Sequence, residues 1–264
     1  MSDRDPRHDL GFDGPASARV YDYSLGGKDN YAPDRSAATD ALGAYSVAHL
    51  LPRENRKFMR RAVRHLLDAG VRQFIDLGCG LPGKGNVHDL ALAADPDAKV
   101  VYVDNDPVAV VHFQSLLHAV PGAIAVKADA RRPDEILGHA EVTALLDADR
   151  PVGILMISML DWIPDEDDPD SIVAAFRDAL VPGGHLVICD FLGDNLTDAD
   201  RATHDELTKR YDISVTFRSS ERFKGFFDGL DLVEPGLVLA PEWRPDRPYD
   251  PPSGWLMAGV GRKP

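Results

Sequence analysis

The amino-acid sequence predicts an α/β protein built on a doubly wound, mostly parallel β-sheet. Short apolar runs and helix-like segments alternate five times between residues 73 and 192, and this order is typical of parallel strands joined by crossover helices. Two further apolar runs, at 230–240 and 254–263, have no helical pattern between them. We therefore expect an antiparallel hairpin to close the sheet. With 264 residues, 44% of them hydrophobic, the chain can bury one large core.

Residues 1–69 are expected to form an N-terminal helical cap or lid, and residues 70–264 the α/β domain. Residues 15–52 are rich in Gly, Tyr, Asp and Ala and show no strand period. Residues 54–69 carry apolar side chains at helical spacing, which predicts an amphipathic helix. A segment with hinge glycines ahead of the first strand can close over a ligand or pack as a cap without touching one. Both interpretations stay open.

The elements of the α/β region follow from apolar runs and from helix-start signals. Strands are expected at 73–78, 100–104, 123–128, 152–160 and 185–192. The run at 152–160 is continuously apolar, which is typical of a strand buried on both faces. Asp106 and Asp168 each precede a proline, a pairing that starts helices. Helices are expected at 85–94, from Pro107, from Pro133, at 169–180, at 198–212 and at 219–228.

A glycine-rich motif, Asp76-Leu-Gly-Cys-Gly-Leu-Pro-Gly83, follows the first strand. Its glycines match G-x-G-x-x-G, which lets backbone amides approach a ligand but also suits a bare tight turn. Asp76 separates two cofactor classes, because nicotinamide-binding folds usually carry an apolar residue there. A carboxylate at that point repels a pyrophosphate and suits the ammonium group of a methionine moiety. We expect Asp76, Gly78 and Gly80 to contact a cofactor.

Polar residues also follow the second, third and fourth strands, at the edge of the sheet where ligands bind. Asp104, next to Asn105, can accept both hydroxyls of a ribose as a bidentate pair. Asp129 can accept a hydrogen bond from the exocyclic amine of adenine, or it can cap the helix that starts at Pro133. The predicted cofactor-binding set is Asp76, Gly78, Gly80, Asp104, Asn105, Asp129, Ala130 and Ser158.

This set of motifs resembles the class I S-adenosylmethionine-dependent methyltransferases over roughly residues 70–264. The shared features are Asp-x-Gly-x-Gly, the acidic residues after strands two and three, Pro182-Gly183-Gly184 before strand five, and the closing hairpin. More narrowly, four segments resemble one bacterial methyltransferase family formerly catalogued as a domain of unknown function: 18–35, 54–63, 162–169 and 226–238. The resemblance implies a Rossmann-like fold and S-adenosylmethionine as cofactor. It implies no particular methyl acceptor, and Leu81-Pro82 departs from the usual glycine spacing.

Methyl transfer asks little of the protein's side chains, because S-adenosylmethionine is already an activated electrophile. The protein binds it, aligns a nucleophile and excludes water, and a general base is needed only when the acceptor arrives protonated. The candidate catalytic residues are Asp161, at the end of strand four, and Asp190, at the end of strand five. For Asp161 the alternative is an ordinary loop carboxylate. The segment Met159–Trp162 lacks the Asn/Asp-Pro-Pro-aromatic turn that often marks enzymes acting on planar amines or amides.

Substrate contacts are expected from two further places. In the N-terminal segment the candidates are Tyr21, Tyr23 and Lys28. In the loop at 241–254, which leaves the ligand side of its strand, they are Trp243 and Tyr249.

Charge and composition exclude several function classes. A net charge of −14 argues against direct binding to nucleic acid. The basic run Arg53–His65 is interpreted as the solvated face of a helix, with a docking patch for an acidic partner as the alternative. The longest apolar stretch is about half of a membrane span, and the polar start of the chain lacks a signal-peptide core. Two cysteines without a CxxC motif predict no metal site. We expect a cytoplasmic protein.

Three hypotheses remain from the sequence. The first is a methyltransferase acting on a small organic acceptor. The second is a non-catalytic S-adenosylmethionine-binding protein, which a sealed cofactor pocket without a second cavity would favour. The third is an NAD(P)-dependent oxidoreductase, against which Asp76 and the closing hairpin both argue. The sequence predicts no oligomeric state.

Overall fold

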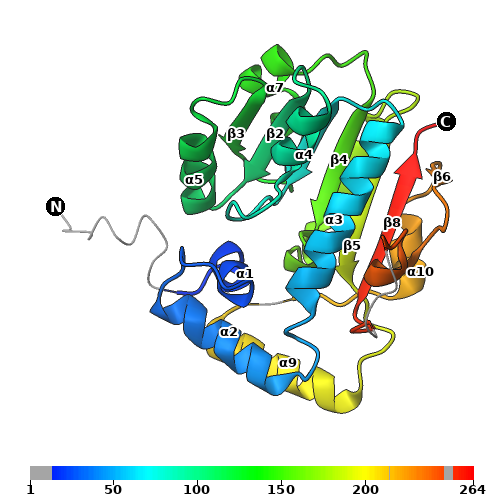
Figure 1. The fold of residues 1–264 in the computed structure, drawn as a ribbon. Helices are drawn as coiled ribbons and strands as arrows, with labels where there is room; N and C mark the ends of the chain where they lie inside the picture. The colour runs from blue at the N-terminus through cyan, green and yellow to red at the C-terminus, as the bar shows by residue number, and fades with distance from the viewer. Residues whose placement is uncertain (1–13, 214, 247–251) are drawn as a thin grey trace.

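A single mixed β-sheet forms the centre of the molecule (Figure 1). The computed structural model describes residues 14–246, apart from Ser214, and residues 252–264. The strand order is β3-β2-β1-β4-β5-β8-β6, and β7 also pairs with β8. The eight strands are β1 Gln73–Leu77, β2 Lys99–Asp104, β3 Ala123–Lys127, β4 Val152–Ile157, β5 His185–Phe191, β6 Asp231–Leu232, β7 Val238–Leu239 and β8 Leu256–Arg262.

Strands β1 to β5 run parallel, and β8 runs antiparallel to β5. This confirms the predicted fold class, a mostly parallel Rossmann-like sheet closed by an antiparallel C-terminal strand. Leu77, the last residue of β1, lies level with Val103 of β2 and Met156 of β4. The carboxyl ends of these three strands therefore meet at one edge of the sheet.

Helices cover both faces of the sheet and bury two apolar layers. On one face, α3 (Leu51–Asp68), α4 (Val87–Ala94) and α5 (Pro107–Leu117) pack against side chains such as Tyr102 and Val187. On the other face, α6 (Pro133–Leu137), α7 (Ala140–Leu145), α8 (Pro169–Asp178) and α10 (Ser220–Gly225) enclose Ile154 and Leu186. Alternate side chains of each strand point to opposite layers, so the central strands are buried on both faces.

Two short helices, α1 (Ser17–Ser24) and α2 (Ala32–Ala44), form a cap at the carboxyl edge of the sheet (Figure 1). Helix α9 (Asp198–Tyr211) lies beside α2, and Arg210 and Tyr211 of α9 both bind the Asp40 carboxylate, at 2.7 and 2.6 Å. Helix α3 belongs to the sheet layer, because its apolar stripe packs on β4, β5 and β8. Among the described residues, no helix is long and apolar enough to span a membrane.

Several elements differ from the predicted boundaries for local physical reasons. The strand expected at 152–160 ends at Ile157, because Ser158 takes a left-handed φ of 49° and a 3₁₀ helix follows at Leu160–Trp162. The strand expected at 230–240 is split into β6 and β7, which are separated by a turn containing Gly236. Both pieces pair antiparallel with β8, so the hairpin is confirmed as two short pairings. Helix α4 starts at Val87, two residues later than predicted.

Candidate active site

A cavity of about 240 Å³ lies where the strand order reverses. Strand β1 pairs with β2 on one side and with β4 on the other, so the connection after β1 runs toward β2 and the connection after β4 runs the opposite way, toward β5. Such a switch point opens a crevice at the carboxyl ends of the strands, where α/β sheets bind ligands. The walls of this first cavity come from the loops after β1 to β4 and from helices α1 and α3.

All residues of the predicted cofactor-binding set line this first cavity: Asp76, Gly78, Gly80, Asp104, Asn105, Asp129, Ala130 and Ser158. Each of them stands at or just after the carboxyl end of a predicted strand, and parallel strands end at the same edge. The sequence analysis missed lining residues that come from helices and from the chain after β4: Ala18, Asn55, Arg56, Met59, Trp162 and Ile163. Nothing in the local sequence indicated which face of those helices would meet the cavity.

Two glycines after β1 are required by their backbone conformation, and one of them also by the close approach of another side chain. Gly78 and Gly80 have φ values of 65° and 62°, which side chains rarely adopt. A Cβ atom at Gly78 would also overlap the side chain of Met159. The Gly78 N–H donates to the Val103 carbonyl (2.9 Å), and the Gly80 N–H donates to Oδ2 of Asp104 (2.8 Å). The loop is thereby fixed to the end of β2.

The Asp104 carboxylate is held in one orientation by backbone donors. Its Oδ1 accepts a hydrogen bond from the Asp106 N–H at 2.9 Å, while Oδ2 accepts from Gly80. The side chain is nearly buried, and burial raises its pKa against the lowering effect of these donors. Each oxygen keeps a second lone pair for another donor. The geometry can therefore accept two vicinal hydroxyl groups.

Asp76 lies beside Asp104 in the wall of the same cavity. Burial raises the pKa of its carboxyl group to about 7, with Asp104 adding to the effect and Arg56 opposing it. A carboxyl group in such a place gains most from a bound cation, because a cation offsets the cost of desolvating the carboxylate.

The basic run Arg53–His65 was expected to be a solvated helix face, and the structure corrects this for its central residues. Arg56 lines the cavity and donates to the Leu81 carbonyl (3.3 Å). Arg60 donates to the carbonyl of Lys84. Arg61 is buried and donates to the carbonyl oxygens of Trp243 and Ala240. These guanidinium groups donate hydrogen bonds to carbonyl oxygens of loops in the same molecule. One of these loops contains Leu81-Pro82, which departs from the usual glycine spacing.

Asp129 lines the cavity but already has a partner. Its carboxylate forms hydrogen bonds with the Arg131 guanidinium at 2.7–3.0 Å, and Arg131 also contacts Asp167 at 2.8 Å. These bonds hold the pKa of Asp129 below its usual range. The helix at Pro133 takes no side-chain cap from Asp129, since its N-cap residue is Arg132. The capping alternative is therefore wrong.

A second cavity, of about 180 Å³, adjoins the first. Both cavities are lined by Tyr21, Ser158 and Trp162, and we call these three residues the neck. The second cavity lies between helices α1, α2 and α9 and the ends of the strands. Aromatic rings follow one another along its wall: Tyr45 to Trp255 at 5.1 Å, Trp255 to Phe217 at 6.3 Å, and Phe217 to Phe191 at 5.4 Å between centroids.

Asp161 and Asp190 form a buried carboxyl pair next to the second cavity. Asp161 is one of its lining residues and is completely buried, and Asp190 is 3% exposed. Oδ1 of Asp190 accepts from the Asp161 N–H (3.1 Å) and the Phe191 N–H (3.0 Å). Both carboxyl oxygens of Asp161 and Oδ2 of Asp190 lack hydrogen-bond partners of good geometry in the described structure.

The electrostatics of this pair follow from burial and mutual repulsion. Burial, and then the charge of Asp190, raise the pKa of Asp161 well above its usual value. Burial raises the pKa of Asp190 to about 7, although the nearby Arg218 guanidinium opposes the shift. Two close carboxyl groups in a dry site do not both ionise readily, so the pair keeps at least one proton near neutral pH, mainly on Asp161. Such a pair can take up or release a proton.

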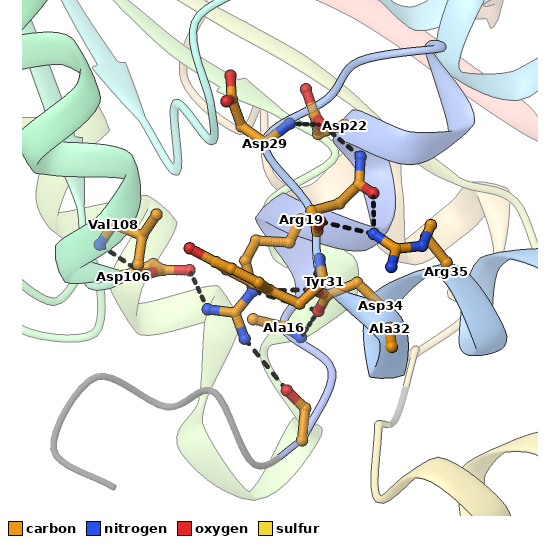
Figure 2. Close-up of polar contacts among 12 residues, drawn as sticks. Ala16, Arg19, Asp22, Asp29, Tyr31, Ala32, Asp34, Arg35, Asp106 and Val108 are labelled. Atoms are coloured by element: carbon orange, nitrogen blue, oxygen red, sulfur yellow. Dashed lines mark hydrogen bonds and ion pairs between the residues drawn. The ribbon is translucent and has the colours of Figure 1, made fainter. Parts of the chain in front are cut away.

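The cap is tied to the cofactor edge through one buried arginine (Figure 2). Arg19 of α1 pairs with Asp34 of α2 at 3.1 Å and reaches Asp106 at 3.6 Å. Asp106 caps α5 by accepting from the Val108 N–H (2.8 Å), and its own N–H binds Asp104. Arg19 therefore links both helices of the cap to the residue that orients the Asp104 carboxylate.

The predicted substrate contacts do not all gather at the site. Tyr21 lines both cavities, and its hydroxyl group donates to the Pro52 carbonyl (3.2 Å). Tyr23 and Lys28 are absent from the residues that line either cavity. Trp243 is completely buried against Phe58 (5.4 Å between ring centroids) and lines neither cavity. Its segment turns back under α3, so its expected place in a substrate pocket is wrong. Tyr249 lies outside the described residues.

Comparisons with known proteins identify the family. The sequence model of the S-adenosyl methyltransferase family matches residues 3–264. The chain belongs to the S-adenosyl methyltransferase family. Its cofactor is S-adenosylmethionine and its reaction is methyl transfer, as the sequence resemblance implied. The methyl acceptor is not identified by this match. No curated protein matches the chain in sequence.

Solved structures of other proteins share the fold. A proposed methyltransferase from Thermobifida fusca is 39% identical, with a TM-score of 0.90 over 98% of both chains. A DUF574 family protein from Streptomyces avermitilis is 33% identical, with a TM-score of 0.91 over 97% of this chain and 100% of the other. An O-methyltransferase family protein from Burkholderia thailandensis, at 14% identity and a TM-score of 0.51 over 86% of this chain and 62% of the other, shares the fold alone.

No group of three or more His, Cys, Asp or Glu side chains is placed to hold a metal ion in the described part of the chain. Both cysteines, Cys79 and Cys189, are free thiols.

Proposed function

We propose that this S-adenosyl methyltransferase methylates a small organic molecule bound in the second cavity. The observation that carries the proposal is the neck, since Tyr21, Ser158 and Trp162 line both cavities. A non-catalytic binding protein needs only the first cavity, whereas a transferase must bring a second ligand against the first. A cytoplasmic location, expected from the sequence, is part of this proposal.

The residues of the first cavity offer suitable partners for each part of S-adenosylmethionine: the methionine moiety, the ribose and the adenine. Asp76 would pair with the ammonium group of the methionine moiety, and Asp104 would accept the ribose hydroxyls. Asn105, Asp129 and Ala130 would surround the adenine, and Gly78 and Gly80 leave room for the ligand against the backbone. The bound cofactor supplies an electrophilic methyl group on a sulfonium. The chain's own task is to orient this group toward the neck and to exclude water.

The Asp161–Asp190 pair would take the proton from a methyl acceptor whose reacting group arrives protonated. A base works best when its pKa is near the working pH, and the pKa of Asp190 is raised to about 7. The backbone N–H of Thr216 donates to the Asp161 carbonyl (2.7 Å), which fixes the backbone of Asp161, and both side chains of the pair are buried. Each of these roles is our proposal for this chain.

Isothermal calorimetry with S-adenosylhomocysteine, run beside NAD and NADP, tests the first cavity. We expect S-adenosylhomocysteine alone to bind, and Asp104→Ala to abolish binding. Asp97→Ala is a matched control, because Asp97 is exposed and precedes the other end of β2. Binding of a nicotinamide cofactor, or unchanged binding in Asp104→Ala, would contradict the assignment.

Filling the second cavity tests where the acceptor binds. Ala41 of α2 lines this cavity, so Ala41→Trp should occupy it and leave S-adenosylhomocysteine affinity unchanged. Ala44→Trp is the control, since Ala44 is exposed at the end of the same helix. Acceptors found by S-adenosylhomocysteine release in a small-molecule panel should lose turnover in Ala41→Trp only. Equal turnover in both variants would place the acceptor elsewhere.

A further inference from the structure

The charge around the second cavity is negative. Its lining residues within the described chain include no lysine and no arginine. Its one histidine, His204, is half-buried, and burial lowers its pKa, so it is neutral near pH 7. The negative charge beside this wall belongs to the pair formed by Asp161, a lining residue, and Asp190. The pKa of Asp161 is raised well above its usual value, so the charge lies mainly on Asp190, whose pKa is raised to about 7. An anionic ligand would meet this negative charge in a poorly screened place.

The apolar part of the wall is aromatic. Tyr45, Trp255, Phe217 and Phe191 form a row of ring contacts between 5.1 and 6.3 Å, with mutual tilts of 58° to 85°. The neck adds the rings of Tyr21 and Trp162. Ring faces attract ammonium groups and also pack well against carbon chains or rings. A neutral ligand would use the second property alone.

The carboxyl pair of Asp161 and Asp190 carries negative charge that a bound cation would neutralise. The Asp161 oxygens lie beneath the cavity wall without hydrogen-bond partners. Arg218 lies nearby, but its guanidinium donates to the carbonyls of Leu160 (2.7 Å) and Ile163 (2.6 Å) and pairs with Asp165 (3.1 Å). The net negative charge of the half-ionised pair therefore acts on the cavity. Buried charge without a partner is costly, and a ligand cation would reduce that cost.

We infer that the methyl acceptor is a small apolar amine, which enters the second cavity as its ammonium ion. This inference rests on the proposed function. The cavity, at about 180 Å³, is smaller than the roughly 300–1,000 Å³ of sites for drug-sized ligands, so the amine carries one ring or a short alkyl chain. An alkyl amine also agrees with the Met159–Trp162 segment, which lacks the turn associated with planar amines and amides.

The chemical step balances without any further reactant. The ammonium group gives one proton to the Asp161–Asp190 pair and becomes a neutral amine with a free lone pair. That lone pair forms the N–CH₃ bond as the S–CH₃ bond breaks, and the bonding electrons stay on sulfur. The products are S-adenosylhomocysteine and the N-methylated ammonium ion, and the positive charge passes from sulfonium to nitrogen.

Binding of matched ligands to the S-adenosylhomocysteine-loaded protein tests the inference by calorimetry. The ligands are 2-phenylethylamine, 2-phenylethanol and phenylacetate, with the corresponding cyclohexyl and hexyl series to vary shape. We expect one amine series to bind at least about tenfold more tightly than its alcohol, and the carboxylates to show no binding. Mass spectrometry with S-adenosylmethionine should then show the N-methyl product.

The double variant Asp161→Asn/Asp190→Asn should remove most of the preference for amine over alcohol and leave alcohol binding unchanged. Asp212→Asn is the matched control, because Asp212 is exposed at the end of α9. The inference is overturned if no amine binds more tightly than its alcohol, if a carboxylate binds best, or if the double variant keeps the preference. Failure of S-adenosylhomocysteine to bind would instead reject the proposed function. Methylation of an alcohol would agree with the proposed function and would contradict the inference that the methyl acceptor is an amine.

Discussion

At the scale of single residues, Asp76 should couple cofactor binding to proton release. Burial raises its pKa to about 7 in the free protein, and the ammonium group of a bound cofactor would lower it. Binding below pH 7 must then release a proton, so affinity for S-adenosylhomocysteine should fall with falling pH, by at most about tenfold per unit. Calorimetry at pH 6, 7 and 8, in buffers of different ionisation enthalpy, measures both effects. Asp76→Asn should remove the proton release, and a pH-independent affinity in the native protein would contradict this role.

Asp161 should lower the stability of the free protein, because its charge is opposed by burial and by Asp190. Carboxyl groups with a raised pKa bind more protons in the folded state than in the unfolded state. Their stabilising contribution is therefore complete below about pH 4, the ordinary value of the unfolded chain, and is lost as pH rises toward 7 and beyond. We expect Asp161→Asn to raise stability by about 1–3 kcal/mol at pH 8 and by much less at pH 5. Urea unfolding at both pH values measures this, and a loss of stability at pH 8 would show that the pair is a structural element.

What the sequence could predict about residues depended on the ends of strands. Asp76, Asp104 and Asp129 lie around one cavity because each stands at or near the carboxyl end of a parallel strand, and those ends share an edge. The partner of Asp129 could not be foreseen, since whether Arg131 turns toward it depends on the path of the loop. Trp243 was placed wrongly for a related reason. A loop's starting edge is known from its strand, but the turn that carries Trp243 under α3 depends on tertiary contacts with Phe58 and Arg61.

At the scale of elements, Arg19 should hold the cap against the sheet. Asp34 is completely buried and would keep only its backbone donors, Ala16 at 2.9 Å and Tyr31 at 2.8 Å, if the guanidinium were removed. Breaking a buried ion pair costs about 3–5 kcal/mol, so Arg19→Met should destabilise the protein on that scale. It should also weaken S-adenosylhomocysteine binding, because Asp106 loses its ion pair next to Asp104. Thermal melting and calorimetry measure the two effects.

Two variants separate this linkage from a general loss of packing. Arg35→Met changes a neighbouring exposed arginine that donates to Asn30 (2.8 Å), and it should alter neither quantity by much. Adding Asp34→Asn to Arg19→Met removes the uncompensated charge and should restore part of the stability. Stability that falls equally in Arg35→Met, or that does not recover in the double variant, would argue against the linkage.

Helices and strands were predicted well where apolar runs are long. They were predicted poorly where an element depends on contacts with distant parts of the chain. The five parallel strands follow from burial on both faces, which leaves an unmistakable apolar run in each. The split of 230–240 into β6 and β7 was not visible, because both halves are apolar and the turn between them is imposed by pairing with β8. The place of α9 beside α2 was also beyond the sequence, since it rests on contacts such as that of Tyr211 with Asp40 (2.6 Å).

At the scale of the whole molecule, cofactor binding should stabilise cap, sheet and α3 together. The first cavity is lined by Ala18 of α1, Asn55 of α3 and Asp104 of β2, so a ligand that fills it would touch all three parts. At 100 times its dissociation constant, S-adenosylhomocysteine adds about 2.7 kcal/mol, which for a domain of this size raises Tm by about 5–10 °C. We expect scanning calorimetry to show a single transition that moves as a whole, and Asp104→Ala to abolish the shift. Two transitions, of which only one moves, would mean that the cap unfolds by itself and that its residues at the neck do not meet the bound cofactor.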